Sequence, residues 1–260
     1  MRIVEPKVFL VGETRTVEAG LRGYLEHIGA PDWATDAPSD SEQLIEVFGR
    51  LCYRSFAPGM NPNVTRTRQG NEPYLGHILE VGHGSVLEHA VLNFVFTDVS
   101  RVMTHELVRH RAGTAMSQES LRFVRLDELS TYAPTHIRES EEAMEVFVRT
   151  VEQLEDIQQA LAEMYTIDDG KKFDEKKKLT SAFRRLAPIG VATSIAWSCN
   201  FRALRHVIEM RTAPESEEEI RLVFGKVYEI VKDRYPNLMG DYEVVEADGL
   251  PWVRTPHSKV

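Results

Sequence analysis

The sequence predicts a fold of the α plus β class, in which long helices and a few strands form a single domain over residues 1–260. Two apolar, β-branched runs are typical of strands, whereas several longer segments repeat their apolar residues at helical spacing. The chain shows no internal repeat and no low-complexity linker, and its length suits one large domain or two small ones. A hydrophobic content of 42% and three Trp indicate a substantial core.

Three segments are predicted to be strands. The first is the short run KVFLVG at residues 7–12. The second, AVLNFVFTDVS at 90–100, alternates Val, Asn and Thr with Leu and Phe, which is the pattern of a half-buried strand. The third, IGVATSIAWSCN at 189–200, is apolar and β-branched. A fourth strand could form from SLRFVRL at 120–126.

Helical spacing is clearest in residues 41–55, where Leu44, Ile45 and Phe48 share a stripe and Asp40 or Ser41 is the expected cap. The other helices are expected at 73–82, from about 100 into the segment beginning at 109, and at 140–168, 179–187, 201–211 and 215–235. Segments 30–41 and 58–74 are rich in turn residues and predict loops. Residues 168–178 predict a charged break whose lysines face solvent.

Composition narrows the classes of function. The chain has 31 basic and 40 acidic residues, a formal charge of −9, which argues against binding a nucleic acid polymer. The two cysteines, Cys52 and Cys199, provide no disulfide framework. No signal-peptide pattern and no apolar run long enough to span a membrane is present. We therefore expect a cytoplasmic protein without a membrane segment.

The first polar cluster is GHGSVLEH at residues 82–89, which groups His83, Ser85, Glu88 and His89 around two glycines. It is either a tight turn with a capped element or a loop that contacts a ligand. A metal site needs three or four convergent ligands, and neither these histidines nor His105 and His110 show a recognised metal spacing. We therefore predict no metal.

The second polar cluster is RHRAGTAMSQESLR at residues 109–122, which is strongly cationic in an acidic chain. Cations at a helix C-terminus would interact favourably with the last carbonyls, but this explains only one or two of them. Arginines among Gly, Ser and Thr suit a phosphate, because guanidinium groups match its oxygens and small residues let backbone N–H groups approach. The cluster therefore favours an anion site.

The third polar cluster is NFRALRHVIEMR at residues 200–211. On a helix, Arg202 and His206 share one face, while Asn200 and Arg211 share another. Such a helix could bridge two ligands or two subunits. The alternative is a surface helix with ordinary cations.

The three clusters, in this order and with RRLAP at 184–188, resemble the flavin-dependent thymidylate synthases over roughly residues 75–235. The resemblance implies methylation of dUMP to dTMP, with methylenetetrahydrofolate as the carbon donor and NADPH as the reductant through FAD. It also implies a central, mainly antiparallel sheet flanked by long helices. A homotetramer would share its active sites among subunits.

The resemblance also assigns residues. Those expected to hold FAD are Ser85, Arg109, His110, Arg111, Gln118, Asn200, Arg202 and His206. Those expected to bind dUMP are Glu106, Arg109, Glu119, Ser120, Leu121, Arg122, Arg211 and, from a neighbouring subunit, Arg184. Two are expected to be catalytic. Arg211 would lie against the uracil and stabilise the charge that develops when N3 loses its proton, and His83 would lie near the flavin and the folate.

The sequence departs from the family pattern at several points. Eight residues, where seven are commoner, separate Arg111 from Ser120, which predicts a bulge within 112–118. Glu106 stands where a Gln is common. The first seventy residues and the tail after about residue 240 match nothing in the pattern. The resemblance gives Ser120 no covalent role, and neither cysteine stands in the context of a nucleophile.

Two other functions fit parts of the sequence. One is a metal hydrolase that uses His83, Glu88, His89 and His110, which bound zinc in place of flavin would reveal. The other is a non-catalytic module that binds nucleotides or RNA. Binding a phosphate requires neither His83 nor Arg211, so the presence of both residues argues against a module that only binds nucleotides or RNA.

Overall fold

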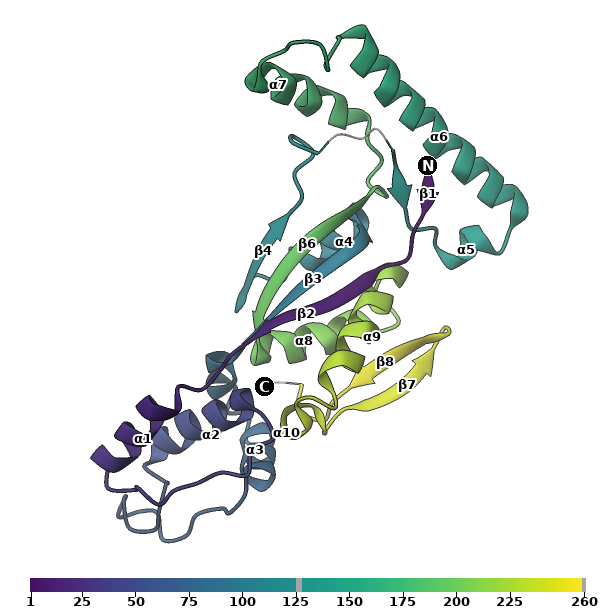
Figure 1. Cartoon of the computed structure of the whole chain (residues 1–260). Helices are drawn as coiled ribbons and strands as arrows, with labels where there is room; N and C mark the ends of the chain where they lie inside the picture. Colours follow the sequence, from purple (N-terminus) through teal and green to yellow (C-terminus); the bar gives the residue numbers. More distant parts are fainter. Residues whose placement is uncertain (125–127, 259–260) are drawn as a thin grey trace.

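The computed structural model describes residues 1–124 and 128–258. Its centre is a four-stranded antiparallel sheet in the order β2–β3–β6–β4 (Figure 1). The strands are β2 (Lys7–Glu13), β3 (Val91–Ser100), β4 (Thr114–Gln118) and β6 (Ala192–Asn200). The three main predicted strands and the antiparallel sheet are thus confirmed, whereas β4, inside the cationic segment, was not predicted.

The two faces of this sheet differ sharply. The cross-strand row Leu10, Phe94, Trp197 and Met116 faces the core, where Phe94 and Trp197 are fully buried. The alternate residues point the other way, and Phe9 on this second face is 48% exposed. Phe9, Val11 and Ala196 are all exposed, so this part of the second face is open to solvent in the single chain.

Two helices cover the buried face. They are α8 (Phe201–Thr212) and α9 (Glu218–Val231), and both contribute several fully buried residues to the main core. Rings of Trp197 and Phe224 meet edge-to-face with centroids 5.5 Å apart, which joins the sheet to α9. The C-terminal hairpin, β7 (Glu243–Ala247) and β8 (Leu250–Arg254), packs against these helices and buries Val253. This hairpin was not predicted.

The N-terminal helices lie at one end of the molecule (Figure 1). They are α1 (Glu18–His27), α2 (Asp40–Tyr53) and α3 (Asn71–Glu80), followed by the 3₁₀ helix η1 (Gly84–His89). The prediction of Asp40 or Ser41 as the α2 cap is wrong: Ser39 Oγ accepts from the Glu42 N–H and donates to its carboxylate. Ser39 and Glu42 have the spacing of a capping box, but the Glu42 carboxylate accepts from the Ser39 hydroxyl in place of the Ser39 backbone N–H.

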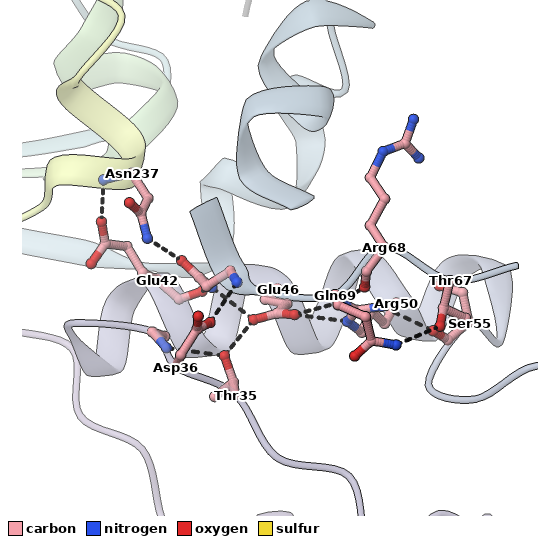
Figure 2. Close-up of polar contacts among 12 residues, drawn as sticks. Thr35, Asp36, Glu42, Glu46, Arg50, Ser55, Thr67, Arg68, Gln69 and Asn237 are labelled. Carbon is pink, nitrogen blue, oxygen red and sulfur yellow. Dashed lines mark hydrogen bonds and ion pairs between the residues drawn. The ribbon is translucent and has the colours of Figure 1, made fainter. Parts of the chain in front are cut away.

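A buried polar network holds these helices together. Figure 2 shows Glu46 accepting from Thr35 and Arg50, and it shows Glu42 accepting from the backbone of Asn237. Asn237 belongs to α10 (Pro236–Met239), so the contact joins the N-terminal helices to the C-terminal half. Each charged group in the network has a partner, which is what makes its burial tolerable.

At the opposite end, α6 (Glu141–Met164) and α7 (Phe173–Phe183) stand away from the sheet (Figure 1). They are flanked by α5 (Thr135–Arg138), η2 (Arg184–Leu186) and the short parallel pair β1 (Arg2–Ile3) and β5 (Ser130–Thr131). No helix among residues 1–124 and 128–258 is long and apolar enough to cross a membrane.

Two further predictions are wrong in this region. The charged break expected at 168–178 ends early, because α7 begins at Phe173 with Asp174 and Glu175 in its first turn. Acidic residues there interact favourably with the helix dipole, so the charge is compatible with a helix. The strand expected at 120–126 is a turn over 121–123, and its residues 125 and 126 lie outside the described part of the chain.

Candidate functional site

The cationic segment 109–122 folds back along a short helix. That helix, α4 (Arg101–Leu107), is capped by Ser100, whose Oγ accepts from the Met103 N–H at 3.1 Å. The segment leaves the C-terminal end of α4 and returns through β4 to the N-terminal end. Seven helical residues span roughly 10 Å. Two polar groups of residues therefore lie at the two ends of α4.

The first group centres on Arg211 near the C-terminal end of α4. The Arg211 Nε donates to His110 Nε2 at 2.7 Å, and its Nη1 lies 2.5 Å from the Glu106 carboxylate. The Nη2 donates to the Glu106 carbonyl at 3.1 Å. His206 meets the His110 ring edge-to-face at a centroid separation of 5.9 Å. The structure thus brings together four predicted site residues from α4, α8 and the segment between α4 and β4.

His110 is held in its neutral form. Burial, then the neighbouring Arg211 and His206, lower the pKa of His110 to about 4. The bond from Arg211 agrees with this, because Nε2 can accept a hydrogen bond only when it carries no proton. At neutral pH the imidazole is therefore an acceptor that orients Arg211, while the guanidinium retains its charge.

This pKa predicts a pH-dependent stability. Between about pH 4 and 6.5 the folded chain binds fewer protons at His110 than the unfolded chain, so the free energy of unfolding falls on acidification through that window. Because His110 is only partly buried, we expect its contribution to be about 1–2 kcal/mol. His110→Gln keeps an acceptor but cannot be protonated. Urea unfolding across the window should show a flatter pH dependence for this variant, and identical curves would refute the assignment.

The second group lines a cavity of about 590 Å³ at the N-terminal end of α4. The predicted residues in its wall are Gln118, Glu119, Ser120, Leu121 and Arg184. Arg101, Ser181 and Arg185, which were not predicted, complete the wall. The resemblance implied that Arg184 would come from a neighbouring subunit, but here the chain's own Arg184 lies in the wall.

Positive charge exceeds negative charge in this cavity. Burial and the nearby Arg184 lower the pKa of Arg101, as expected for a guanidinium close to a like charge. The Arg101 Nη2 donates to the Glu119 carbonyl at 2.9 Å, but its buried Nε finds no partner among the described residues. The Glu119 carboxylate accepts from the Ser194 N–H at 3.0 Å on β6. An anion is the ligand that this arrangement suits.

A third group lies where η1 meets α8. Arg202 pairs with Glu88 at 2.6 Å, and a Cβ on Gly84 would approach the Arg202 Nε within 2.8 Å. His83 lies beside Tyr53, whose hydroxyl is 3.2 Å from the His83 Nε2. Ser85 is exposed on η1. Glycine at position 84 therefore lets the backbone of η1 approach the Arg202 guanidinium closely.

Asn200 has a structural role that the sequence did not reveal. Its Oδ1 caps α8 by accepting from the Ala203 N–H at 2.8 Å, and its N–H donates to the Gly113 carbonyl at 2.9 Å. Gly113 has φ of +69°, and a Cβ there would lie 2.5 Å from Asn200 Nδ2. Only glycine fits this turn.

The bulge predicted within residues 112–118 is absent from β4. This strand pairs with β6 in continuous register from Thr114 to Gln118. The segment turns at Ala112 and Gly113, immediately before the strand begins. The spacer between Arg111 and Ser120 therefore consists of this turn, strand β4 and Glu119. Gln118, at the end of β4, donates to Thr104 on α4 at 3.0 Å and so joins the strand to the helix.

Three arginines that were predicted to bind a ligand lie outside these three groups. Arg109, Arg111 and Arg122 are exposed, and none forms an ion pair with any residue of the described ranges. Within those ranges, no three His, Cys, Asp or Glu side chains are arranged to hold a metal ion. His89 instead packs against the Phe48 ring, with centroids 4.4 Å apart and an interplanar angle of 37°.

Comparison with known proteins agrees with these observations. The sequence profile of a family described as "Thymidylate synthase complementing protein" matches residues 35–237. The flavin-dependent thymidylate synthase of Corynebacterium diphtheriae is 37% identical over 234 residues, covering 87% of this chain and 89% of that protein. The corresponding enzyme of Mycobacteroides abscessus is 36% identical over 234 residues, with 86% and 89% covered. The likeness therefore begins well before residue 75.

Solved structures show the same fold. Thymidylate Synthase X from Helicobacter pylori, solved with FAD and dUMP, superposes with a TM-score of 0.58 at 20% identity, covering 90% of this chain and 96% of that one. The UMP/dUMP methylase PolB from Streptomyces cacaoi, bound to 5-Br dUMP, gives 0.61 at 16% identity, with 92% and 95% covered.

Proposed function

The chain belongs to the family of flavin-dependent thymidylate synthases, and from that premise we propose that it methylates dUMP to dTMP with FAD as cofactor. We further propose that methylenetetrahydrofolate supplies the carbon and NADPH the reducing power, and that residues 1–260 act as one domain. The main core supports the last point, because it contains buried residues from Ile45 to Val253.

The observation that carries this proposal is the pair of polar groups at the two ends of α4. The cavity beside Ser120 and Arg184 suits the phosphate of dUMP, and Arg211 with His110 and Glu106 suits the polar edge of uracil. The helix between them is roughly 10 Å long, comparable to an extended nucleotide. One dUMP molecule could therefore contact both groups.

The residues around η1 and α8 fit the proposed FAD. Arg202 beside the narrow space at Gly84, and the exposed Arg109 and Arg111, provide cations for a pyrophosphate. His110 and His206 provide ring surfaces and hydrogen-bonding groups close to Arg211. FAD would supply the hydride that NADPH provides. We propose that these residues, with Ser85, Gln118 and Asn200, hold it, and that His83 lies near the flavin and the folate.

Arg211 is the residue proposed to act on the base. Its side chain is 14% exposed, and its guanidinium is held by His110 and Glu106. A positioned cation against uracil would stabilise the negative charge that remains when N3 loses its proton, which makes C5 more nucleophilic. The Glu106 carboxylate lies at the opposite end of α4 from the cavity. There it can accept a bond from the base or ribose without repelling the phosphate.

The uncovered face of the sheet supports a homotetramer. Phe9, Val95 and Ala196 form a cross-strand row on this face, and Val11 is 63% exposed. An exposed apolar surface of this kind is typical of a protein–protein interface. We propose that copies of the chain cover it and share their active sites.

The experiment that tests the function is an omission assay for dTMP. Purified protein is incubated with dUMP, methylenetetrahydrofolate, NADPH and FAD, and each is left out in turn. We expect dTMP only in the complete mixture, because methylenetetrahydrofolate supplies the carbon and NADPH the electrons, while FAD, which is regenerated, passes those electrons on. For the arm without FAD, the bound flavin is first removed from the protein. Formation of dTMP by this flavin-free protein, or no dTMP from flavin-loaded protein, would refute the proposal.

A further inference from the structure

Helix α9 begins with three consecutive carboxylates that make three different contacts. Glu217 caps its own helix, accepting from the Glu219 N–H at 2.9 Å and the Ile220 N–H at 3.3 Å. Glu218 accepts from the Tyr132 hydroxyl at 2.6 Å and from Thr135. Glu219 points elsewhere and is only 1% exposed.

Glu219 is bound to the first turn of α4. Its Oε1 accepts from the Ser100 N–H at 2.6 Å, and its Oε2 accepts from the Ser100 hydroxyl. Ser100 is the residue that caps α4 through Met103. The carboxylate therefore takes both donors of one residue, which fixes the position and the rotation of the helix start.

The position of the start of α4 affects both polar groups of the site, because each group contains a residue of this helix. Arg101, the next residue, lies in the wall of the cavity, and Glu106 at the other end of α4 pairs with Arg211. Because i→i−4 hydrogen bonds tie the seven residues of α4 together, we expect a displacement of its first residue to be passed on to both ends. Glu219 itself touches neither group.

We infer that Glu219 is a positioning residue for dUMP binding, which acts through Ser100 to place α4 between the cavity and Arg211. This inference rests on the proposed function, since it names what α4 positions. Burying a carboxylate beside Glu217 and Glu218 is costly, and burial above all raises its pKa to about 7. The two bonds from Ser100 offset part of that cost.

The test compares two Glu→Gln variants in the same turn of α9. In Glu219→Gln the amide oxygen can still accept from the Ser100 N–H, but the amide nitrogen cannot accept from the Ser100 hydroxyl, which loses the acceptor for its proton. We expect its KM and Kd for dUMP to rise about ten-fold, with FAD content unchanged. Glu218→Gln removes the same charge but leaves the contact with α4 intact. Its KM and Kd for dUMP should remain those of the wild type.

A second variant keeps the inference testable if the Glu219→Gln protein does not fold. Ser100→Ala removes the hydroxyl contact and keeps the backbone contact, so its Kd for dUMP should rise in the same direction. A lowered melting temperature with an unchanged Kd in both variants would overturn the inference, as would an equal rise in Glu218→Gln. Calorimetric Kd values need no turnover. If the wild type binds dUMP but makes no dTMP, the proposed function is refuted. The Kd values of the variants still show whether Glu219 positions α4 for dUMP binding.

Discussion

Replacement of Arg211 with alanine is expected to lower kcat/KM for dTMP formation by about 10²–10³-fold while FAD remains bound. The guanidinium is the only cation in contact with both His110 and Glu106 among the described residues. Without it, Glu106 would present an unpaired carboxylate to the base, and the charge developing on uracil would lose its stabilising partner. Steady-state kinetics, with flavin content measured by absorbance, checks this result.

Arg211→Lys is the matched control for this experiment. Lysine keeps the charge but cannot contact His110 and Glu106 at the same time with the geometry of a guanidinium. We expect an activity between those of the alanine variant and the wild type. Near-normal turnover in Arg211→Ala would show that the cation does not act on the base.

The second large effect is expected at the cavity. Arg184→Gln should raise KM for dUMP by about 10–100-fold, because it removes a charge-assisted contact with the phosphate. Deoxyuridine lacks that phosphate, so its much weaker binding should be the same in the variant and the wild type. The comparison of the two ligands separates a phosphate contact from a general disturbance of the fold.

Arg149→Gln, at an exposed position on α6, is the control for loss of one positive charge. It should leave the binding of both ligands unchanged. If Arg184→Gln weakens deoxyuridine as much as dUMP, the cavity does not hold the phosphate.

The sequence predicted those elements whose pattern is local. Strands β3 and β6 and helices α8 and α9 have regular apolar repeats, so their type could be read directly. Strand β4, with small and polar residues such as Thr114, Ala115 and Ser117, has no such repeat and is a strand because it pairs with β6. The cap at Ser39 could have been found, since Ser39 and Glu42 have the spacing of a capping box.

The residue patterns alone gave three separate clusters, and only the resemblance to the family assigned their residues to one site. Arg211 lies 101 residues from His110 and 105 from Glu106, and no spacing rule joins residues so distant. Arg101 was missed because it begins a helix with an apolar inner face and resembles an ordinary surface cation. Its role appears only when the fold places it beside Arg184.

The most direct test of the account is a single turnover without oxygen. Protein whose FAD has been reduced is mixed with dUMP and methylenetetrahydrofolate, and flavin absorbance and dTMP are followed together. We expect reoxidised flavin and dTMP to appear in equal amounts, and Arg211→Ala to slow both. Formation of dTMP while the flavin stays reduced, or complete reoxidation without dTMP, would contradict it.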